Sequence, residues 1–104
     1  MHRIAFKMQL FDGYADEYKK RHDEIWPELI SLLKNTGIHD YSIFLDEETN
    51  SLFAILKIND PSVISALAEK EVMKKWWTSL KDIMRVNPDH SPIVIPLKEI
   101  FYLD

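Results

Sequence analysis

Histidine is the side-chain type in this chain that is best suited to moving protons, because its ordinary pKa near 6.5 lets it donate and accept them at neutral pH. Tyr18 and His22 are four residues apart in a helical pattern, so their side chains fall on one helix face. Pro27 interrupts that pattern soon afterwards. A histidine beside a phenol at a broken helix end suits acid–base catalysis, although an ordinary surface or packed histidine gives the same pattern.

The other three histidines carry weaker signals. His2 lies at the terminus and His90 lies in a polar loop, so we expect both at the surface. His39 shares a predicted strand face with Tyr41 and Ile43, and it can therefore enter or border a pocket. No two histidines have His-x-His or His-x-x-x-His spacing and the chain has no cysteine, so we expect no metal site.

Two adjacent tryptophans, Trp76 and Trp77, are the second unusual feature. Neighbouring helical positions diverge by about 100°, so one ring can pack in the core while the other lines a groove. Aromatic rings cover the apolar C–H faces of sugars and also anchor protein interfaces, and core packing is the commoner role of either ring alone. The residues thus predict a small acid–base pocket with aromatic walls.

Composition excludes several other classes of protein. Thirteen Lys and Arg against 17 Asp and Glu give a net charge of −4, which argues against a nucleic-acid partner. Two glycines cannot build a glycine-rich phosphate cradle, and the absence of cysteine excludes disulfide scaffolds and thiol nucleophiles. No apolar run approaches the roughly 20 residues of a membrane span, so we expect a cytoplasmic protein without a membrane partner.

The elements that must position these residues follow from the hydrophobic periodicity. Alternation of apolar and polar side chains indicates strands, and Pro27 divides one helical pattern into two pieces. We expect strands at 3–10, 38–46, 51–59 and 96–103, helices at 13–22 and 27–36, and a helical stretch from 61 that breaks near 69–71.

This β-α-β-β-α-β order predicts an α+β, ferredoxin-like fold, an antiparallel sheet with helices on one face. The 104 residues suit a single domain, 1–104. Both faces of the strand at 51–59 are apolar, because Phe53 and Ile55 alternate with Leu52 and Ala54. The face without helices needs a ligand pocket, a second sheet or both, and a homodimer of the dimeric α/β-barrel type with stacked sheets would cover it.

Motifs spread over essentially the whole chain together resemble the L-rhamnose mutarotase family. They are the run Arg21-His22-Asp23-Glu24-Ile25-Trp26-Pro27-Glu28-Leu29, Tyr41, the pair Trp76-Trp77, the loop 87–92 and the end Phe101-Tyr102-Leu103. The resemblance implies a homodimeric, ferredoxin-like isomerase that interconverts the α and β anomers of L-rhamnose without metal or organic cofactor, in the service of rhamnose catabolism.

Carried over by position, the resemblance implies His22 as the proton donor. It also places the aromatic side chains of Tyr18, Tyr41, Trp76 and Trp77 around the sugar. Opening and closing a pyranose needs one acid and one base that exchange roles in the reverse direction. The base stays open, since a water, a tyrosine or a carboxylate can serve.

Three other functions are compatible with this element order. A cofactor-free or haem-linked monooxygenase would need an apolar cavity for an aromatic substrate or for haem. A non-catalytic dimeric binding module would use Trp76 and Trp77 at its interface, and loss of His22 would leave its function intact. An RNA-recognition domain is set aside, because the strand 51–56 lacks the basic-Gly-aromatic signature and the charge is negative.

Overall fold

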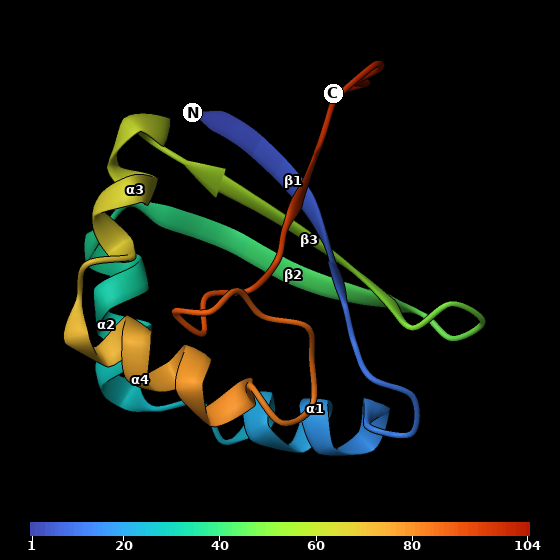
Figure 1. The fold of residues 1–104 in the computed structure, drawn as a ribbon. Helices are drawn as coiled ribbons and strands as arrows, with labels where there is room; N and C mark the ends of the chain where they lie inside the picture. Colours follow the sequence, from blue (N-terminus) through green and yellow to red (C-terminus); the bar gives the residue numbers. More distant parts are fainter.

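The alternating segments pair into one antiparallel sheet in the computed structural model, which describes residues 1–104 (Figure 1). The strands are β1 (His2–Gln9), β2 (Ile38–Asp46), β3 (Ser51–Ile58) and β4 (Ile95–Leu97), in the order β2-β3-β1-β4 across the sheet. The helices are α1 (Ala15–Asp23), α2 (Pro27–Asn35), α3 (Ile64–Leu67) and α4 (Glu71–Leu80), and a short 3-10 turn, η1 (Pro61–Val63), precedes α3. The predicted ferredoxin-like α+β fold is confirmed.

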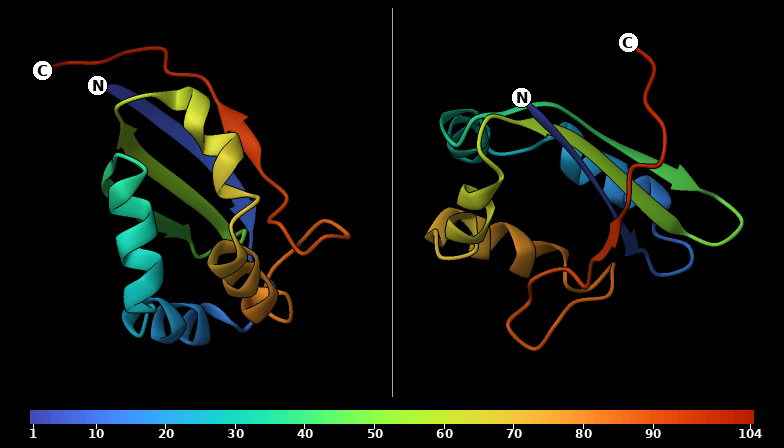
Figure 2. Two further views of the ribbon diagram at one scale, coloured as in Figure 1. Left: turned by 90° about the vertical axis from the view of Figure 1, so that its left-hand side faces the viewer. Right: turned by 90° about the horizontal axis from the view of Figure 1, so that it is seen from above.

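The inner face of β3 carries the core of the molecule. Leu52, Ala54, Leu56 and Ile58 alternate toward the helices, and each is at most 3% exposed. The helices lie over this one face of the sheet (Figure 2). Their apolar residues close over β3 and leave the opposite, outer face of the sheet without a helical cover. No helix is long and apolar enough to cross a membrane.

The last strand is shorter than the sequence pattern predicts. We expected a strand over 96–103, but β4 spans only Ile95–Leu97 beside β1. The chain beyond β4 runs past the N-terminal end of β1 (Figure 1). Side-chain contacts hold it there in place of a backbone ladder, since Arg3 pairs with Glu99 at 3.2 Å and its guanidinium lies 3.8 Å from the centre of the Tyr102 ring.

A bulge in β2 changes which side chains face the helices. Between His39 and Ser42, two residues, Asp40 and Tyr41, lie opposite the single residue Leu56 of β3, and Asp40 has a left-handed φ of 48°. The extra residue shifts the alternation, so Tyr41 turns toward the helices while His39 stays on the outer face. The prediction that these two side chains share a face was wrong, because strict alternation does not anticipate a bulge.

Backbone strain at Asp40 gives a stability prediction. Asp40→Val should lower the free energy of unfolding by about 1–2 kcal/mol, because a β-branched residue tolerates left-handed backbone poorly. Asp40→Gly should stay close to wild type, because relief at φ 48° offsets the loss of an exposed ion pair with Lys57 at 3.3 Å. Urea unfolding measures both values, and equal losses in the two variants would contradict the bulge geometry.

Candidate active site

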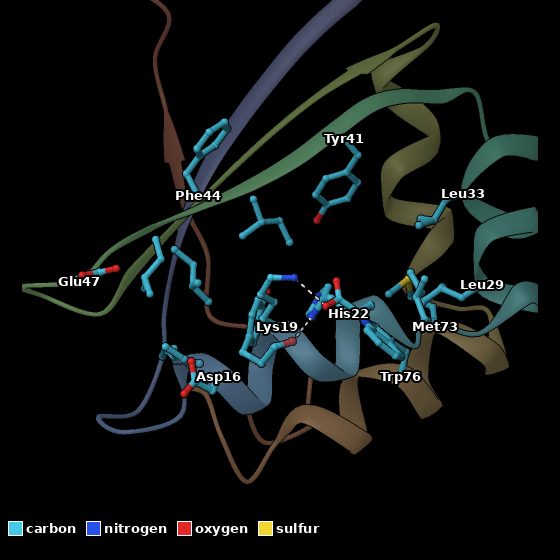
Figure 3. A pocket seen from close by; sticks show the side chains of 18 residues that line it. Asp16, Lys19, His22, Leu29, Leu33, Tyr41, Phe44, Glu47, Met73 and Trp76 are labelled. Carbon is cyan, nitrogen blue, oxygen red and sulfur yellow. Dashed lines mark hydrogen bonds and ion pairs between the residues drawn. The ribbon is translucent and has the colours of Figure 1, made fainter.

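A cavity of about 660 Å³ lies between α1, α2, α4 and the inner side of β2 (Figure 3). Thirteen of its 18 lining residues are hydrophobic. The titratable side chains are Asp16, Tyr18, Lys19, His22, Asp23, Tyr41 and Glu47. An apolar cavity of this size with a few convergent polar groups is typical of a small-molecule site.

Aromatic rings hold the His22 side chain on two sides. The Tyr18 and His22 rings stack with centroids 4.1 Å apart and planes at 30°. The Trp76 ring meets His22 edge-on at 5.2 Å, and Trp26 in turn meets Trp76 edge-on at 5.2 Å. The four-residue spacing of Tyr18 and His22 thus places the two side chains together as predicted, and α4 supplies the second wall.

One hydrogen bond decides which nitrogen of His22 faces a ligand. Nδ1 lies 2.9 Å from the Tyr18 carbonyl oxygen. A carbonyl only accepts, so Nδ1 carries the hydrogen and donates it, and Nε2 is the nitrogen available to a ligand. Burial lowers the pKa of His22 below its ordinary value of 6.5, against smaller raising effects of that carbonyl and of Asp23. The imidazolium is therefore a stronger acid than that of a free histidine.

The two phenols at the cavity are held in their protonated form. Burial raises the pKa of Tyr41 to about 12 and also raises that of Tyr18, to which the nearby Tyr41 adds. Tyr41 is 39% exposed as a whole residue, but its hydroxyl points into the cavity toward His22 (Figure 3). At neutral pH both groups are hydrogen-bonding hydroxyls and neither is an ionised base.

The structure brings together four of the five predicted site residues. Tyr18, His22, Tyr41 and Trp76 all line the cavity. Trp77 does not, because the rotation between neighbouring helical positions turns it away, and it is half-buried against the main core cluster. The functional roles of all five residues stay predictions.

Sequence reasoning missed the charged groups at the cavity. Asp16, Lys19 and Asp23 come from α1, and Glu47 follows β2. Their helical spacing of three and four residues was the available signal, and Lys19 does pair with Asp23 at 2.7 Å. Nowhere in the chain do three or more His, Cys, Asp or Glu side chains group in a way that could hold a metal ion.

Comparison with known proteins first gives the class. A crystal structure of an antibiotic biosynthesis monooxygenase matches with a TM-score of 0.63 at 11% identity, covering 96% of this chain and 99% of that one. Likeness at this identity shows the fold alone. The molecule is thus a ferredoxin-like protein with a histidine-containing cavity, and the match gives no support to monooxygenase activity.

Four closer matches give the family. The family model described as L-rhamnose mutarotase matches residues 3–103. L-rhamnose mutarotases of Formosa agariphila and Acidiphilium cryptum are 54% and 53% identical to this chain, over 100% and 99% of both sequences. A crystal structure of an L-rhamnose mutarotase from Formosa agariphila has a TM-score of 0.93 at 53% identity and covers 100% of both chains. The chain belongs to the L-rhamnose mutarotase family, whose activity is that of an isomerase acting on carbohydrates.

Burial of His22 gives a titration prediction. In wild type the His22 imidazole should titrate below pH 6.5, and Tyr41→Ala should move its pKa upward toward 6.5 by admitting water to the cavity. Proton NMR of the imidazole resonances measures both values. The control is His39→Ala, which lies on the same strand as Tyr41 but on the outer face of the sheet. It should leave the His22 titration unchanged. A wild-type pKa at or above 6.5 would contradict this account.

Proposed function

We propose that the cavity beside His22 is where this chain opens and recloses L-rhamnose, with His22 as the proton donor and Tyr18, Tyr41 and Trp76 as contacts of the sugar. The observation that carries the proposal is the Nδ1–H bond of His22 to the Tyr18 carbonyl, which leaves Nε2 available to a ligand in the cavity that Tyr41 also lines. Trp77 stays a predicted sugar contact without a place in this cavity. The expected setting is rhamnose catabolism in the cytoplasm.

The proposed reaction moves one proton onto the sugar and takes one away. Nε2–H of the His22 imidazolium protonates the ring oxygen while a base removes the proton of the anomeric hydroxyl, and the bond between C1 and the ring oxygen breaks. The aldehyde then rotates about C1–C2 and closes on its other face. Closure returns the proton to Nε2 and reprotonates the anomeric oxygen, so every group ends as it began.

Fewer groups can serve as the base than the sequence alone allowed. The raised pKa values of Tyr18 and Tyr41 keep both phenols protonated, which leaves a water or a carboxylate for this role. Asp16, Asp23 and Glu47 are the carboxylates at the cavity. The phenols then donate hydrogen bonds to sugar hydroxyls.

The lining of the cavity suits a neutral 6-deoxy sugar. Trp76 offers an aromatic surface to the sugar's C–H bonds, and the buried apolar side chains of Leu29 and Met73 suit the methyl group on C5. A neutral ligand needs no cationic clamp. In agreement, the only cationic side chain at the cavity apart from His22, Lys19, already pairs with Asp23.

Loss of His22 should abolish most of the catalysis. His22→Ala should reduce the enzymatic rate of anomer exchange by about 10²–10⁴-fold, the usual contribution of a positioned acid–base group. NMR saturation transfer between the two anomers of L-rhamnose at equilibrium measures this rate, with a sample lacking protein as background. His39→Ala, an exposed histidine on the outer face, should retain the wild-type rate. Full activity of His22→Ala would move the acid elsewhere.

The pH profile of the same rate tests the direction of proton transfer. If the imidazolium is the active form, the contribution of His22 falls as pH rises through its pKa, which burial places below 6.5. A contribution that rises with pH over that range would instead make His22 the base. Circular dichroism at each pH checks that the protein stays folded.

We also propose that the chain forms a homodimer through the outer face of its sheet. Phe44, Ile55, Ile95 and Leu97 are exposed large apolar side chains of three strands, and their register places them on the face opposite the helices. A second copy can cover this face by stacking sheet on sheet.

A charge at the centre of that face should split the dimer. Ile55→Lys should shift the protein toward monomer, because its ammonium group would be buried between the sheets without a partner. Ala68→Lys adds the same charge at an exposed position outside the sheet, and this variant should keep the molar mass of a dimer in solution. Light scattering after size-exclusion chromatography measures both. A monomeric wild type, or a dimeric Ile55→Lys variant, would contradict the proposed interface.

A further inference from the structure

One side chain links the helix that carries His22 to the helix that carries Trp76. The guanidinium of Arg21 donates from Nη1 to the Ser79 carbonyl oxygen at 2.6 Å and to Asp82 Oδ1 at 2.9 Å. Its Nη2 donates to Asp82 Oδ2 at 3.1 Å, and its Nε donates to Glu17 Oε1 at 3.2 Å. The planar guanidinium of Arg21 therefore binds both its own helix, α1, and the C-terminal end of α4.

The two ends of this link adjoin the walls of the cavity. Arg21 directly precedes His22 in the last turn of α1, and Ser79 follows Trp76 by one turn of α4. The edge-on contact of His22 with Trp76 at 5.2 Å crosses the same gap between the two helices. A change in the spacing or rotation of α1 against α4 would therefore change where Nε2 of His22 points.

Other ion pairs of these helices do not cross that gap. Lys19 pairs with Asp23 within α1, and Lys74 pairs with Glu71 within α4. The Arg21 side chain is also less exposed, at 26%, than the 51% of Lys74. The hydrogen bonds from Arg21 lower the pKa of Asp82, so this carboxylate stays charged at neutral pH.

We propose that Arg21 is a positioning residue of the isomerase: by fastening α1 to the end of α4 it holds His22 in the orientation that proton transfer requires. The inference rests on the proposed role of His22. A lysine cannot replace Arg21, because one ammonium group lacks the fork that reaches both oxygens of Asp82 and the Ser79 carbonyl together.

Kinetics of Arg21→Lys and Arg21→Ala test this role at a temperature where circular dichroism shows both folded. We expect kcat for anomer exchange of L-rhamnose to fall by about 10–100-fold while KM changes less than about 3-fold, because the sugar contacts remain and the acid is misplaced. Asp82→Asn should give a smaller loss of kcat. Lys74→Ala, which removes a pair confined to α4, should match wild type.

NMR of the sugar-free protein supplies a readout that does not depend on activity. In Arg21→Ala the imidazole resonances of His22 should shift and its pKa should move toward 6.5, with Lys74→Ala as the unaffected control. If Arg21→Ala lowers the melting temperature but leaves kcat and the His22 titration unchanged, the residue is only structural and the inference is overturned. If His22→Ala retains full activity, the proposed role of His22 as the acid is wrong, and the His22 titration still decides whether Arg21 positions the ring.

Discussion

The burial of one face of β3 is the constraint on which the rest of the structure depends. Leu52, Ala54, Leu56 and Ile58 can leave water only if a layer of helices covers them, and each such side chain larger than alanine gains about 1.5–3 kcal/mol when fully buried. The helices close over this face but remain apart where α1, α2 and α4 meet β2. The cavity lies at that meeting point, so the site is a consequence of how the core is covered.

Burial also shifts the pKa values of three proton-carrying side chains in the cavity, His22, Tyr18 and Tyr41. A medium that solvates charge poorly favours the neutral form of each group, so it lowers the pKa of His22 and raises those of Tyr18 and Tyr41. Of these three groups only the histidine can change its protonation state near neutral pH, and the two phenols stay protonated. A neutral sugar that exchanges one proton at each of two oxygens needs this division of roles and no strong charge.

Local periodicity was sufficient to predict most elements and part of the site. The Tyr18–His22 pair follows from helical spacing, and the strand boundaries follow from alternation, because both depend on neighbours in the sequence. The inward turn of Tyr41 depends on a bulge that one extra residue creates, and no pattern marks that residue beforehand. The short β4 was missed because apolar residues alone do not make a strand when side chains rather than a backbone ladder hold the segment.

Contacts far apart in the sequence lay outside such reasoning altogether. The partners of Arg21, Ser79 at the end of α4 and Asp82 just after it, are 58 and 61 residues away. Local sequence indicates only that a basic residue such as Arg21 suits the last turn of a helix. Trp76 and Trp77 show the same limit: their divergence was predictable, but which ring faces His22 depends on how α4 is rotated against the sheet.

β2 joins the site to the outer face of the sheet. Tyr41, Ile43 and Phe44 of this strand all line the cavity. By register, Ser42 and Phe44 alternate to the outer face of the sheet, so Phe44 borders both the cavity and that face. β2 is an edge strand that only β3 holds by backbone hydrogen bonds, and the bulge removes part of that ladder where Tyr41 lies. If a second copy packed against Phe44, it would therefore restrain β2, the strand that positions the Tyr41 hydroxyl. In such a dimer, the stability of the interface and the geometry of the site would depend on alternate residues of one strand.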